Sequence, residues 1–461
     1  MEFIVRPEQK VTARHYDVVV AGGGTGGVFA AIAAARRGAK VALIEQKGYV
    51  GGIAAEGGCG LHSFYNLGRA FGVEKRKVVR GIPEEFIDRL FAMGGCSGHN
   101  ATILNYEYDD DSLCVDVEVY KLAALEMLRE AGVHVMLNTF VADVLGSGDI
   151  VTGVITESHE GCEAVMGKLF IDSTGYGDLC ARAGAKYSEP NDYAVANSMG
   201  VGGIDIDRYY EAMKENGSLR EYARGPRSGK ENQIIRVSGN FLEKNADINV
   251  LRDIGMAPVT TTIHDNYFMF IKLNYIMPVS PTNRDALADA EYELRRRQRA
   301  AVELLRKNVP GAENAFIART APAVTIRRAR CIECDYDITN EEIMNGTHYP
   351  DEVFSYGFHD LAPQVHIRDG GTYGLPYRSM IVKNKANVFA IGMMVTSDFT
   401  AHMSTRNTVS CMAMGQAAGT AAALLATSGL NGVRDLPYEE LYKALKADGV
   451  WFDAEAPYMK M

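Results

Sequence analysis

The sequence predicts an α/β fold in which a parallel-sheet domain is interrupted by an inserted α+β domain. Three observations carry this prediction: an apolar strand that runs into a glycine cluster near the N-terminus, an alternation of short apolar strands and helices up to residue 185, and the return of that alternation near the C-terminus. The parallel-sheet domain is therefore expected to be discontinuous, with parts at residues 1–185 and 363–461. The inserted substrate or cap domain is expected at residues 186–362.

The N-terminal unit is "DVVVAGGGTGGVFAAIAAARRGAKVALIEQ", residues 17–46. Residues 18–20 form a run of valines, which favours a buried strand, and residues 41–44 form a second apolar strand that ends at Glu45. An alanine-rich helix lies between the two strands. The glycines fall in the G-x-G-x-x-G register at Gly22, Gly24 and Gly27.

This arrangement predicts a Rossmann-like dinucleotide site. The first glycine allows the tight turn, the second lets the backbone approach a pyrophosphate, and the third lets the helix pack on the strand. The helix N-terminus offers free N–H groups and a partial positive charge to the phosphates. Glu45 is expected to accept hydrogen bonds from an adenosine ribose. The motif by itself leaves the choice of dinucleotide open.

Composition limits the other function classes. The 461 residues are 47% hydrophobic and 23% charged, which is typical of a soluble globular enzyme. The net charge of −10 argues against nucleic acid or an anionic membrane as the main partner. The N-terminal residues lack the apolar core of a signal peptide, which predicts a cytoplasmic protein. The stretch "CMAMGQAAGTAAALLA" is interpreted as too short and too weakly apolar to span a bilayer, and as a buried helix packed on the sheet.

Eight cysteines are scattered along the chain, which indicates free thiols in a reducing compartment. Cys331 and Cys334 have C-x-x-C spacing, but the surrounding "VTIRRARCIECDYDIT" alternates like a strand and would point the two sulfurs to opposite faces. A dithiol oxidoreductase is therefore a minor hypothesis. No metal site is expected, because a second C-x-x-C is missing.

Further elements follow from local patterns. Residues 47–66 are too glycine-rich for helix or strand, and their Gly51-Gly52 pair is interpreted as a second place where backbone lies against a ligand. The remaining expectations are a helix over 113–131 ended by Gly132, a strand over 133–137, hairpin strands over 140–172, a glycine turn with a short helix over 172–185, and a charged helix over 283–308.

Several ordered motifs together indicate the cofactor. They are the first glycine cluster, Gly51-Gly52, "DSTGYGDLCARAGA", "LPYRSM", "NVFAIG" and "STRNTVSCMAMGQAAGTAAALL". They resemble the glutathione-reductase-type FAD-binding fold, and more specifically the family of FAD-dependent oxidoreductases related to the flavin subunit of heterodisulfide reductase. The resemblance implies FAD. A nicotinamide dehydrogenase would not need the C-terminal glycine strand and helix, and the chain has no second G-x-G-x-x-G.

The resemblance also implies residue roles. It places the first glycine turn against the pyrophosphate, Glu45 against the adenosine ribose, and the backbone of Val141 against the adenine edge. It places the helix turn at 407–409 against the pyrimidine edge of the flavin, where a helix N-terminus stabilises negative charge. Met393 departs from the pattern, because many relatives carry an acidic residue there; Asp398 is a candidate substitute. The implied FAD-binding residues are Gly22, Gly24, Thr25, Gly26, Gly27, Glu45, Gln46, Gly51, Gly52, Val141, Thr174, Gly175, Gly392, Asn407, Thr408 and Val409.

Candidates for the chemistry lie near the implied flavin. His402 is interpreted as an acid/base or hydrogen-bonding group and Arg406 as an anion or carbonyl binder, with bracing of the loop as the alternative. His62 follows the Gly51-Gly52 loop and is expected to line the same pocket.

An arginine-rich segment is a further candidate. Strand alternation predicts that Arg330 and Arg328 face the pocket together and that Arg327 faces away, with plain salt bridges as the alternative. His359 and Asp360 resemble a family segment on the substrate side.

The sequence therefore predicts a FAD-dependent oxidoreductase that transfers a hydride between flavin N5 and a small polar organic substrate, as a dehydrogenase, an oxidase or an alkene reductase. An external electron acceptor and a homo-oligomer are compatible with this interpretation. The alternative is a flavin electron-transfer subunit of a larger redox complex; such subunits usually carry iron–sulfur motifs, and the sequence has none. No motif supports a flavin halogenase or monooxygenase.

Overall fold

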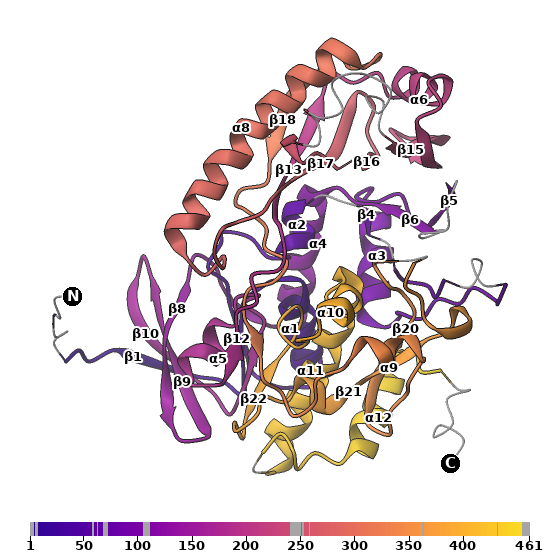
Figure 1. Cartoon of the computed structure of the whole chain (residues 1–461). Helices are drawn as coiled ribbons and strands as arrows, with labels where there is room; N and C mark the ends of the chain where they lie inside the picture. The colour runs from indigo at the N-terminus through magenta and orange to yellow at the C-terminus, as the bar shows by residue number, and fades with distance from the viewer. Residues whose placement is uncertain are drawn as a thin grey trace.

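The computed structural model describes residues 4, 8–57, 60–61, 63–67, 72–104, 111–239, 250, 253–257, 259–361, 364–430 and 432–453. Its centre is a five-stranded sheet in the order β22-β11-β2-β3-β7, in which all neighbouring strands are parallel. Four strands come from the N-terminal part of the chain and β22 from near its C-terminus, which confirms the predicted discontinuous Rossmann-like fold (Figure 1). The strands are β2 (Val18–Ala21), β3 (Val41–Ile44), β7 (His134–Met136), β11 (Leu169–Asp172) and β22 (Val388–Ala390).

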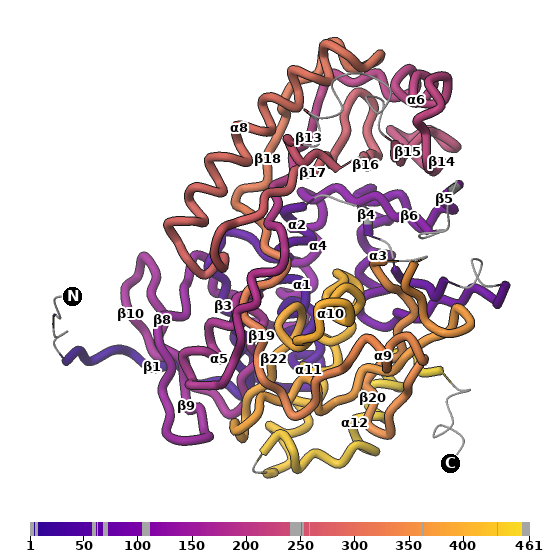
Figure 2. The backbone as a smooth tube through the Cα atoms, viewed as in Figure 1, coloured from indigo at the N-terminus to yellow at the C-terminus, as the bar shows by residue number. Residues whose placement is uncertain are grey.

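Two helices from opposite ends of the chain pack side by side on this sheet. They are α1 (Thr25–Arg36) and α11 (Thr408–Ser428), drawn in indigo and yellow-orange in Figure 2. A Cβ atom on Gly415 would lie 2.1 Å from the carbonyl oxygen of Gly26, and one on Gly419 would lie 2.1 Å from that of Ala30. The two helix backbones are therefore in direct contact, and the small residues of α11 are what permits this approach.

Helix α11 is long and apolar enough to cross a membrane, which contradicts the prediction that it is too short and too weakly apolar. However, 89% of its most apolar window is buried inside the fold, as expected for a helix packed on a sheet. The longer of the remaining helices are α3 (Ile82–Ala92), α4 (Val117–Glu130), α6 (Ile206–Glu215), α8 (Arg284–Asn308) and α12 (Tyr438–Ala447).

A nine-stranded antiparallel sheet forms the upper part of the molecule in Figure 1, and α8 runs along it. Its strand order is β18-β13-β17-β16-β15-β14-β5-β6-β4. The strands are β4 (Gly60–Leu61), β5 (Asn100–Leu104), β6 (Asp111–Cys114), β13 (Val195–Gly202), β14 (Leu219–Arg227), β15 (Lys230–Gly239), β16 (Val259–Thr261), β17 (Tyr267–Tyr275) and β18 (Phe316–Thr320).

This sheet takes β4, β5 and β6 from the segment that precedes the predicted inserted domain. The predicted bounds 1–185, 186–362 and 363–461 remain a prediction, and residues 362 and 363 lie outside the described residues. Helix α8 begins after Asn283, whose side chain accepts hydrogen bonds from the N–H groups of Asp285 and Ala286, as the predicted helix over 283–308 requires.

A four-stranded sheet, β1-β10-β9-β8, packs beside the parallel sheet. Its strands are β1 (Thr12–His15), β8 (Phe140–Ser147), β9 (Ile150–Ser158) and β10 (Gly161–Met166), which confirms the predicted hairpins. The remaining elements are short: α2 (Ile53–Gly57), α5 (Asp178–Arg182), β12 (Tyr187–Ser188), β19 (Cys331–Ile332), α9 (Asn340–Met344), β20 (Glu352–Tyr356), η3 (Arg368–Gly370), β21 (Tyr373–Pro376), η4 (Tyr377–Met380) and α10 (Phe399–Thr405).

Two local expectations were wrong. Residues 47–66 were expected to hold no regular element, yet they contain α2 and β4, because Ala54 and Ala55 can bury themselves against the core despite the flanking glycines. The helix expected over 113–131 begins only at Val117, since Asp116 caps it and residues 111–114 pair as β6. Gly132 adopts φ +81 just beyond this helix, as predicted for its C-terminal end.

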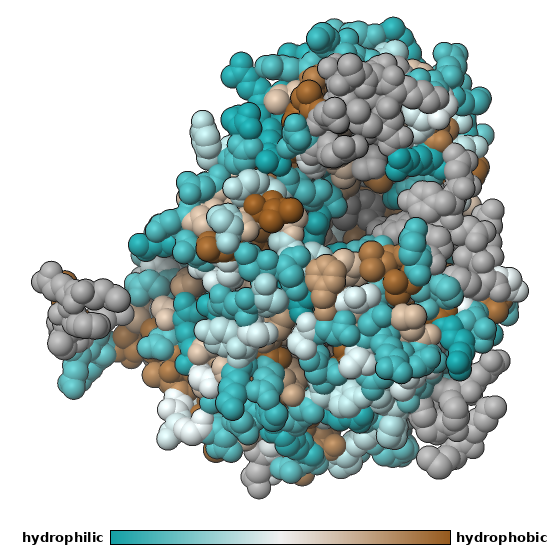
Figure 3. All heavy atoms as spheres, viewed as in Figure 1, coloured by the Kyte–Doolittle hydropathy of each residue, from teal (hydrophilic) through white to brown (hydrophobic). Residues whose placement is uncertain are grey.

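The seven described cysteines are free thiols, and Cys331 and Cys334 are both buried. Burial raises the pKa of the Cys331 thiol, and raises that of Cys334 as well. The face shown in Figure 3 is mostly hydrophilic, with apolar atoms in small separate groups. It is hollowed between the part that carries α8 and α6 and the part below.

Candidate functional site

A cavity of about 1510 Å³ lies where the parallel sheet meets the antiparallel sheet. It is larger than the roughly 300–1,000 Å³ that a pocket for one drug-sized ligand occupies. Residues from both ends of the chain form one side of it, which we call the cradle. The predicted FAD-binding residues that line the cradle are Gly22, Gly24, Thr25, Gly26, Glu45, Gln46, Gly52, Val141, Thr174, Gly175, Gly392, Asn407 and Thr408.

The first glycine turn is shaped by close backbone contacts. Gly22 has φ +93, and a Cβ there would lie 2.5 Å from the Ser173 carbonyl oxygen. Gly24 faces the cavity, and a Cβ on it would contact only the Ser173 oxygen at 3.5 Å. Gly27 is not among the residues that line the cavity, and its approach to the pyrophosphate stays a prediction. A Cβ on Gly27 would lie 1.9 Å from the Gly22 carbonyl oxygen, so this glycine serves the packing of α1 on the turn.

Glu45 lies at the end of β3, buried and on the cavity wall. Its two carboxylate oxygens accept hydrogen bonds from the backbone N–H groups of Gly23 (2.7 Å) and Lys47 (2.8 Å). Burial raises the pKa of Glu45 despite these bonds, since it disfavours the charged form. The carboxylate thus fixes the turn around the cradle, and each oxygen keeps a further lone pair for a ribose hydroxyl.

The Gly51-Gly52 turn packs directly on the first glycine turn. A Cβ on Gly52 would lie 2.9 Å from the Gly24 Cα, and Thr25 Oγ1 donates to the Gly51 carbonyl oxygen at 3.2 Å. Gly51, with φ +105, does not line the cavity, contrary to the expectation. Its missing side chain instead makes room for Tyr120, whose ring a Cβ would approach to 2.5 Å.

A buried carboxylate, Asp172, holds the turn over the cradle. One of its oxygens accepts bonds from the Thr174 N–H (3.0 Å) and Oγ1 (2.8 Å), and the other accepts from the Cys180 N–H (2.8 Å). Burial raises the pKa of Asp172. Sequence reasoning gave Asp172 no role, although its place at the end of an apolar strand is a signal that could have identified it.

The C-terminal segment completes the cradle. Gly392, with φ +84, ends the segment after β22, and Asn407 and Thr408 open α11 against the cavity. The Val409 side chain is buried in the core, whereas its predicted contact with the flavin runs through a backbone N–H group at the start of α11 and stays a prediction. Asp398 was a candidate near the ribityl chain; it instead caps α10 through the N–H groups of Thr400 and Ala401 and does not line the cavity.

The two predicted catalytic residues, Arg406 and His402, lie in different surroundings in the structure. Arg406 lines the cavity, ion-paired with Asp360 and stacked over the Tyr193 ring at 5.3 Å. His402 is fully buried behind the wall, where its Nε2 bonds to the Arg327 carbonyl oxygen at 3.0 Å. Burial, together with the nearby arginines, holds the pKa of His402 well below its ordinary value, so the ring stays neutral. His402 is therefore not part of the cavity lining, and its predicted role in the reaction stays a prediction.

The arginine segment also differs from its prediction. Arg327 and Arg330 line the cavity, whereas Arg328 is buried and donates to Asp192 and to the carbonyl oxygen of Thr396. Residues 327–330 form no strand, so the two-residue alternation does not apply to them. Arg330 donates to the Tyr176 carbonyl oxygen (2.8 Å) and pairs with Asp178, which makes it a brace of the turn over the cradle.

Two further histidines were candidates for the cavity. His62 lies outside the described residues. His359 is buried with Nε2 facing Asn340 Oδ1 at 3.2 Å, and burial lowers its pKa to about 4. Its neighbour Asp360 does line the cavity. Among the described residues, no group of His, Cys, Asp and Glu could hold a metal ion.

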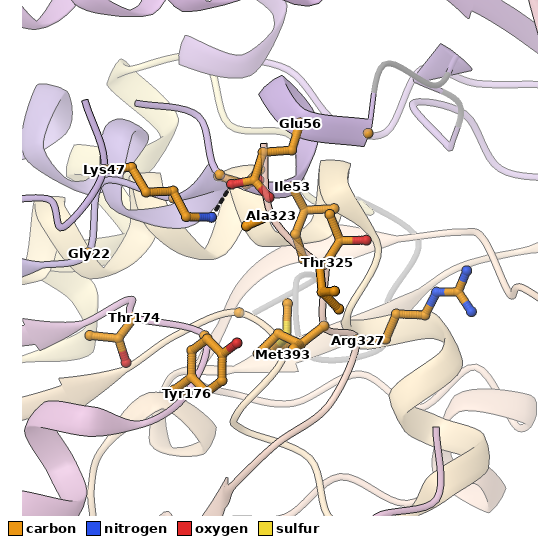
Figure 4. A pocket seen from close by; sticks show the side chains of 18 of the residues that line it. Gly22, Lys47, Ile53, Glu56, Thr174, Tyr176, Ala323, Thr325, Arg327 and Met393 are labelled. Carbon is orange, nitrogen blue, oxygen red and sulfur yellow. Dashed lines mark hydrogen bonds and ion pairs between the residues drawn. The ribbon is translucent and has the colours of Figure 1, made fainter. Parts of the chain in front are cut away.

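Sequence reasoning missed the polar residues at the centre of the cavity (Figure 4). Glu56, at the end of α2, is 1% exposed and accepts bonds from Lys47 and from the Tyr49 hydroxyl (3.0 Å). The Tyr176 hydroxyl lies on the other side of the same open space. Burial raises the pKa of Tyr176, with smaller contributions from Glu56 and Asp178, so its hydroxyl remains a donor. The assumption that residues 47–66 form a loop hid this cluster.

The opposite side of the cavity, which we call the sheet-side lobe, is built by the antiparallel sheet, the start of α8 and the segment 322–327. Its lining residues are Ser198, Arg236, Ala257, Val259, Phe270, Lys272, Pro281, Thr282, Arg284, Leu287, Ala288, Glu291, Pro322, Ala323, Val324, Thr325, Ile326 and Arg327.

The cradle fits a dinucleotide with a flavin. Both α1 and α11 begin at the cavity without a side-chain cap and without an acidic residue in the first turn. By contrast, Asp116, Asp205 and Asn283 cap α4, α6 and α8. Uncapped N-termini leave N–H donors for phosphate oxygens and for the negative edge of a reduced flavin. The fold and site therefore define a dinucleotide-binding redox protein.

The family comparison gives the same answer. The chain matches the family described as FAD dependent oxidoreductase over residues 17–445, and it belongs to that family. FAD is accordingly its cofactor, and the protein is a FAD-dependent oxidoreductase. A stretch of 71 residues is 41% identical to dihydrolipoyl dehydrogenase of Acholeplasma laidlawii. That stretch is 15% of this chain and spans about a fifth (21%) of the relative.

Similar solved structures include a geranylgeranyl bacteriochlorophyll reductase-like protein from Thermoplasma acidophilum, with a TM-score of 0.48 and 12% identity over 97% of this chain and 96% of that one. A p-nitrophenol 4-monooxygenase from Pseudomonas putida aligns with a TM-score of 0.46 and 12% identity over 98% and 92% of the two chains.

Proposed function

We propose that this oxidoreductase transfers a hydride between N5 of the flavin and a small organic substrate whose reacting carbon carries or adjoins a polar group. One observation supports the proposal most directly: the cradle and the sheet-side lobe are two sides of a single cavity. A substrate in the lobe therefore shares one space with the cofactor. When bound, FAD supplies the two-electron chemistry.

The chain's own residues would orient the substrate and handle its proton. Glu56 offers a carboxylate that Lys47 and Tyr49 hold in place, and Tyr176 offers a hydroxyl donor across the open space. An acceptor and a donor on facing walls suit a substrate whose oxygen or nitrogen changes its hydrogen bonding as the carbon is oxidised or reduced. Arg406, stacked on Tyr193 and paired with Asp360, would fix a carbonyl or anionic group near the start of α11.

The test is anaerobic mixing of the purified flavoprotein with a panel of alcohols, amines and hydroxy acids, followed by flavin absorbance. Bleaching by one of these compounds, with equimolar formation of the oxidised product, is the expected result for a dehydrogenase or oxidase. Reoxidation of the pre-reduced flavin by an activated alkene would identify a reductase instead. A flavin that exchanges electrons only with protein partners, and with no small molecule in either assay, would contradict the proposal and favour an electron-transfer subunit.

A further inference from the structure

We infer that the substrate is an alcohol, oxidised at a carbon that carries both a hydroxyl group and a hydrogen, and that Glu56 takes up the hydroxyl proton while Tyr176 donates a hydrogen bond to the same oxygen. Both residues line the cavity and face its central open space (Figure 4). The inference rests on the proposed function, because it selects one substrate class and one base from those that the proposed function allows.

The main chain of Glu56 is fixed between the two binding regions. Its carbonyl oxygen accepts hydrogen bonds from Ser198 Oγ on β13 at 3.3 Å and from Arg319 Nη1 at the edge strand β18 at 3.4 Å. Helix α2, which carries Glu56, begins directly after Gly52, where a Cβ would lie 2.9 Å from the Gly24 Cα. One end of this short helix is therefore attached to the glycine turns of the cradle and the other to the antiparallel sheet. Such a position suits a group that must meet both cofactor and substrate.

The Glu56 carboxylate is held through one of its two oxygens. Lys47 Nζ pairs with Oε1, and the Tyr49 hydroxyl donates to the same Oε1 at 3.0 Å. Oε2 is bonded to no group in the described part of the chain, and it is not sealed off from the cavity. Lys47 also supplies the counter-charge that an almost completely buried carboxylate needs to stay ionised. An ionised carboxylate only accepts protons, so Oε2 can accept one from a hydroxyl in the cavity.

Tyr176 provides a hydrogen-bond donor on the opposite wall. Its hydroxyl lies across the open space from Glu56 (Figure 4), and its main-chain carbonyl oxygen accepts a bond from Arg330 at 2.8 Å. Burial raises the pKa of Tyr176, and the Glu56 charge raises it further, which shows that the two groups are close enough to interact. The tyrosine therefore keeps its proton and donates it in a hydrogen bond, whereas the glutamate accepts.

This facing donor and acceptor distinguish between the possible substrates. A hydroxyl group has one proton to donate to Glu56 and lone pairs to accept from Tyr176, so it satisfies both walls at once. An alkylammonium group has protons but no lone pair, which leaves the Tyr176 proton without an acceptor. An activated alkene has no acidic proton for Glu56. The alcohol is the class that matches both groups.

The bonds and electrons of this step balance. The O–H bond breaks and its proton passes to Glu56 Oε2. The C–H bond on the same carbon breaks, and its hydrogen leaves with the bonding electron pair as the hydride of the proposed function. The electron pair of the former O–H bond forms the second bond of a carbonyl group, so the product is an aldehyde or a ketone. A positioned general base of this kind contributes about 10²–10⁴-fold in rate.

The test uses three sets of compounds, each with one carbon skeleton: propan-2-ol, isopropylamine and propene; lactate, alanine and acrylate; and 1-phenylethanol, 1-phenylethylamine and styrene. Alcohols and amines are mixed anaerobically with the oxidised flavoprotein, and alkenes with the pre-reduced flavoprotein, while flavin absorbance is recorded. In at least one set the alcohol should bleach the flavin at least about tenfold faster than the amine. The alkenes should not reoxidise it.

Variants connect the reaction to the two residues. Glu56→Gln keeps the size of the side chain and should slow bleaching by the alcohol at least about a hundredfold. Tyr176→Phe removes the donor and should slow it about tenfold. Glu333→Gln is the matched control, because Glu333 forms an exposed pair with Lys383, and it should leave the rate unchanged. The ratio of flavin to protein, measured for every variant, shows that each one has folded and bound FAD.

Binding of the ketone product gives a second readout that needs no turnover. Acetone, pyruvate and acetophenone are dialysed against the oxidised flavoprotein, and the ketone of the reactive set is compared between variants. A ketone has no proton to donate to the Glu56 carboxylate, whereas the amide of Glu56→Gln can donate an N–H to the ketone oxygen. Glu56→Gln should therefore bind this ketone about tenfold more tightly than the unchanged protein. Glu333→Gln should bind it equally.

Bleaching by amines alone, or reoxidation by alkenes alone, would overturn the inference and leave the proposed function intact. A flavin-loaded Glu56→Gln that oxidises the alcohol within about threefold of the original rate would overturn the assignment of the base. Unchanged or weaker ketone binding by Glu56→Gln would overturn it as well. Failure of the proposed function has a different appearance, because the flavin would then exchange electrons with none of the nine compounds.

Discussion

Lys47 and Glu56 form an ion pair on the cavity wall, across the Gly51-Gly52 turn that separates them in sequence. The glutamate is 1% exposed, whereas the lysine is 30% exposed. The pair therefore joins an almost completely buried carboxylate to a cation that still reaches water, and the two partners are not equivalent.

This asymmetry predicts unequal costs of mutation. Lys47→Met should lower the free energy of unfolding by about 1–3 kcal/mol, because it leaves the buried Glu56 carboxylate without its counter-charge. Glu56→Gln should cost less, since the lysine can turn to solvent. Urea unfolding of the two single variants and of the double variant measures the coupling. As a control, Lys383→Met breaks an exposed pair with Glu333 that solvent screens, and should leave the free energy of unfolding almost unchanged. Equal costs for Lys47→Met and Lys383→Met would contradict the assignment.

Gly24 and Gly27 should respond differently to the same substitution. Gly24→Ala places a methyl group in open cavity, so the apoprotein should keep its stability within about 1 kcal/mol, while FAD affinity falls at least about tenfold. Gly27→Ala pushes a methyl group onto the Gly22 carbonyl oxygen and should destabilise the apoprotein by about 1–3 kcal/mol. Thermal unfolding and FAD titration of both apoproteins measure the two effects. Intact FAD affinity in Gly24→Ala would show that the pyrophosphate lies elsewhere.

The buried His359 predicts an acid-sensitive component of stability. Burial lowers its pKa to about 4, whereas an unfolded histidine titrates near 6.5. Between these values the unfolded state binds the extra proton, so stability is complete above about pH 6.5 and falls as the pH drops towards 4, by roughly 3 kcal/mol in all. His359→Gln should flatten this part of the stability–pH curve measured by urea unfolding. His15→Gln, at an exposed site, should leave the curve unchanged. An unflattened curve in His359→Gln would show that other groups cause the loss.

Asp116 connects the start of α4 with the turn between β16 and β17. Its carboxylate accepts from the Glu118 N–H at 2.8 Å and pairs with His264 at 2.7 Å. Burial opposes ionisation of Asp116, but these bonds outweigh it, so its pKa lies below the ordinary value.

Substitutions separate the two contacts of Asp116. Asp116→Asn keeps the cap and loses the ion pair, at a cost of about 0–1 kcal/mol because His264 is 42% exposed. Asp116→Ala loses the cap too, for about 1 kcal/mol more. The cost of Asp116→Asn should be lost in acid, as the pH falls through the lowered pKa of Asp116 and the native carboxyl takes up its proton. A cost that does not change with pH would refute the ion pair.

Much of the cradle could be predicted from sequence, because its signals are local. A glycine turn, a strand-end carboxylate such as Glu45 and an alanine-rich helix each occupy a few consecutive residues. The nine-stranded sheet, whose other strands carry part of the sheet-side lobe, could not be predicted this way. Strands β4 and β6 are only two and four residues long, and they gain their hydrogen bonds from distant partners, so no local pattern marks them.

Some side chains lie elsewhere than the sequence predicts, again because their positions depend on distant parts of the chain. Arg327 and Arg328 were assigned faces by strand alternation, but their segment is irregular and follows the shape of its neighbours. His402 has the sequence position of an active-site residue, yet its place behind the wall depends on how α10 packs against residues far away in the chain. Side-chain direction in irregular segments is a property of tertiary packing, which a single sequence does not display.

The position of β22 in the central sheet affects how the chain can fold during its synthesis. Strand β11 is complete at residue 172, yet its outer neighbour β22 is synthesised only at residues 388–390. Until residues 388–390 have been synthesised, the backbone N–H and C=O groups on one edge of β11 therefore lack their native partner strand and can pair with another strand. The same stretch of chain carries Gly392, Asn407 and Thr408 of the cradle, so the FAD site is complete only after residue 408 has been synthesised.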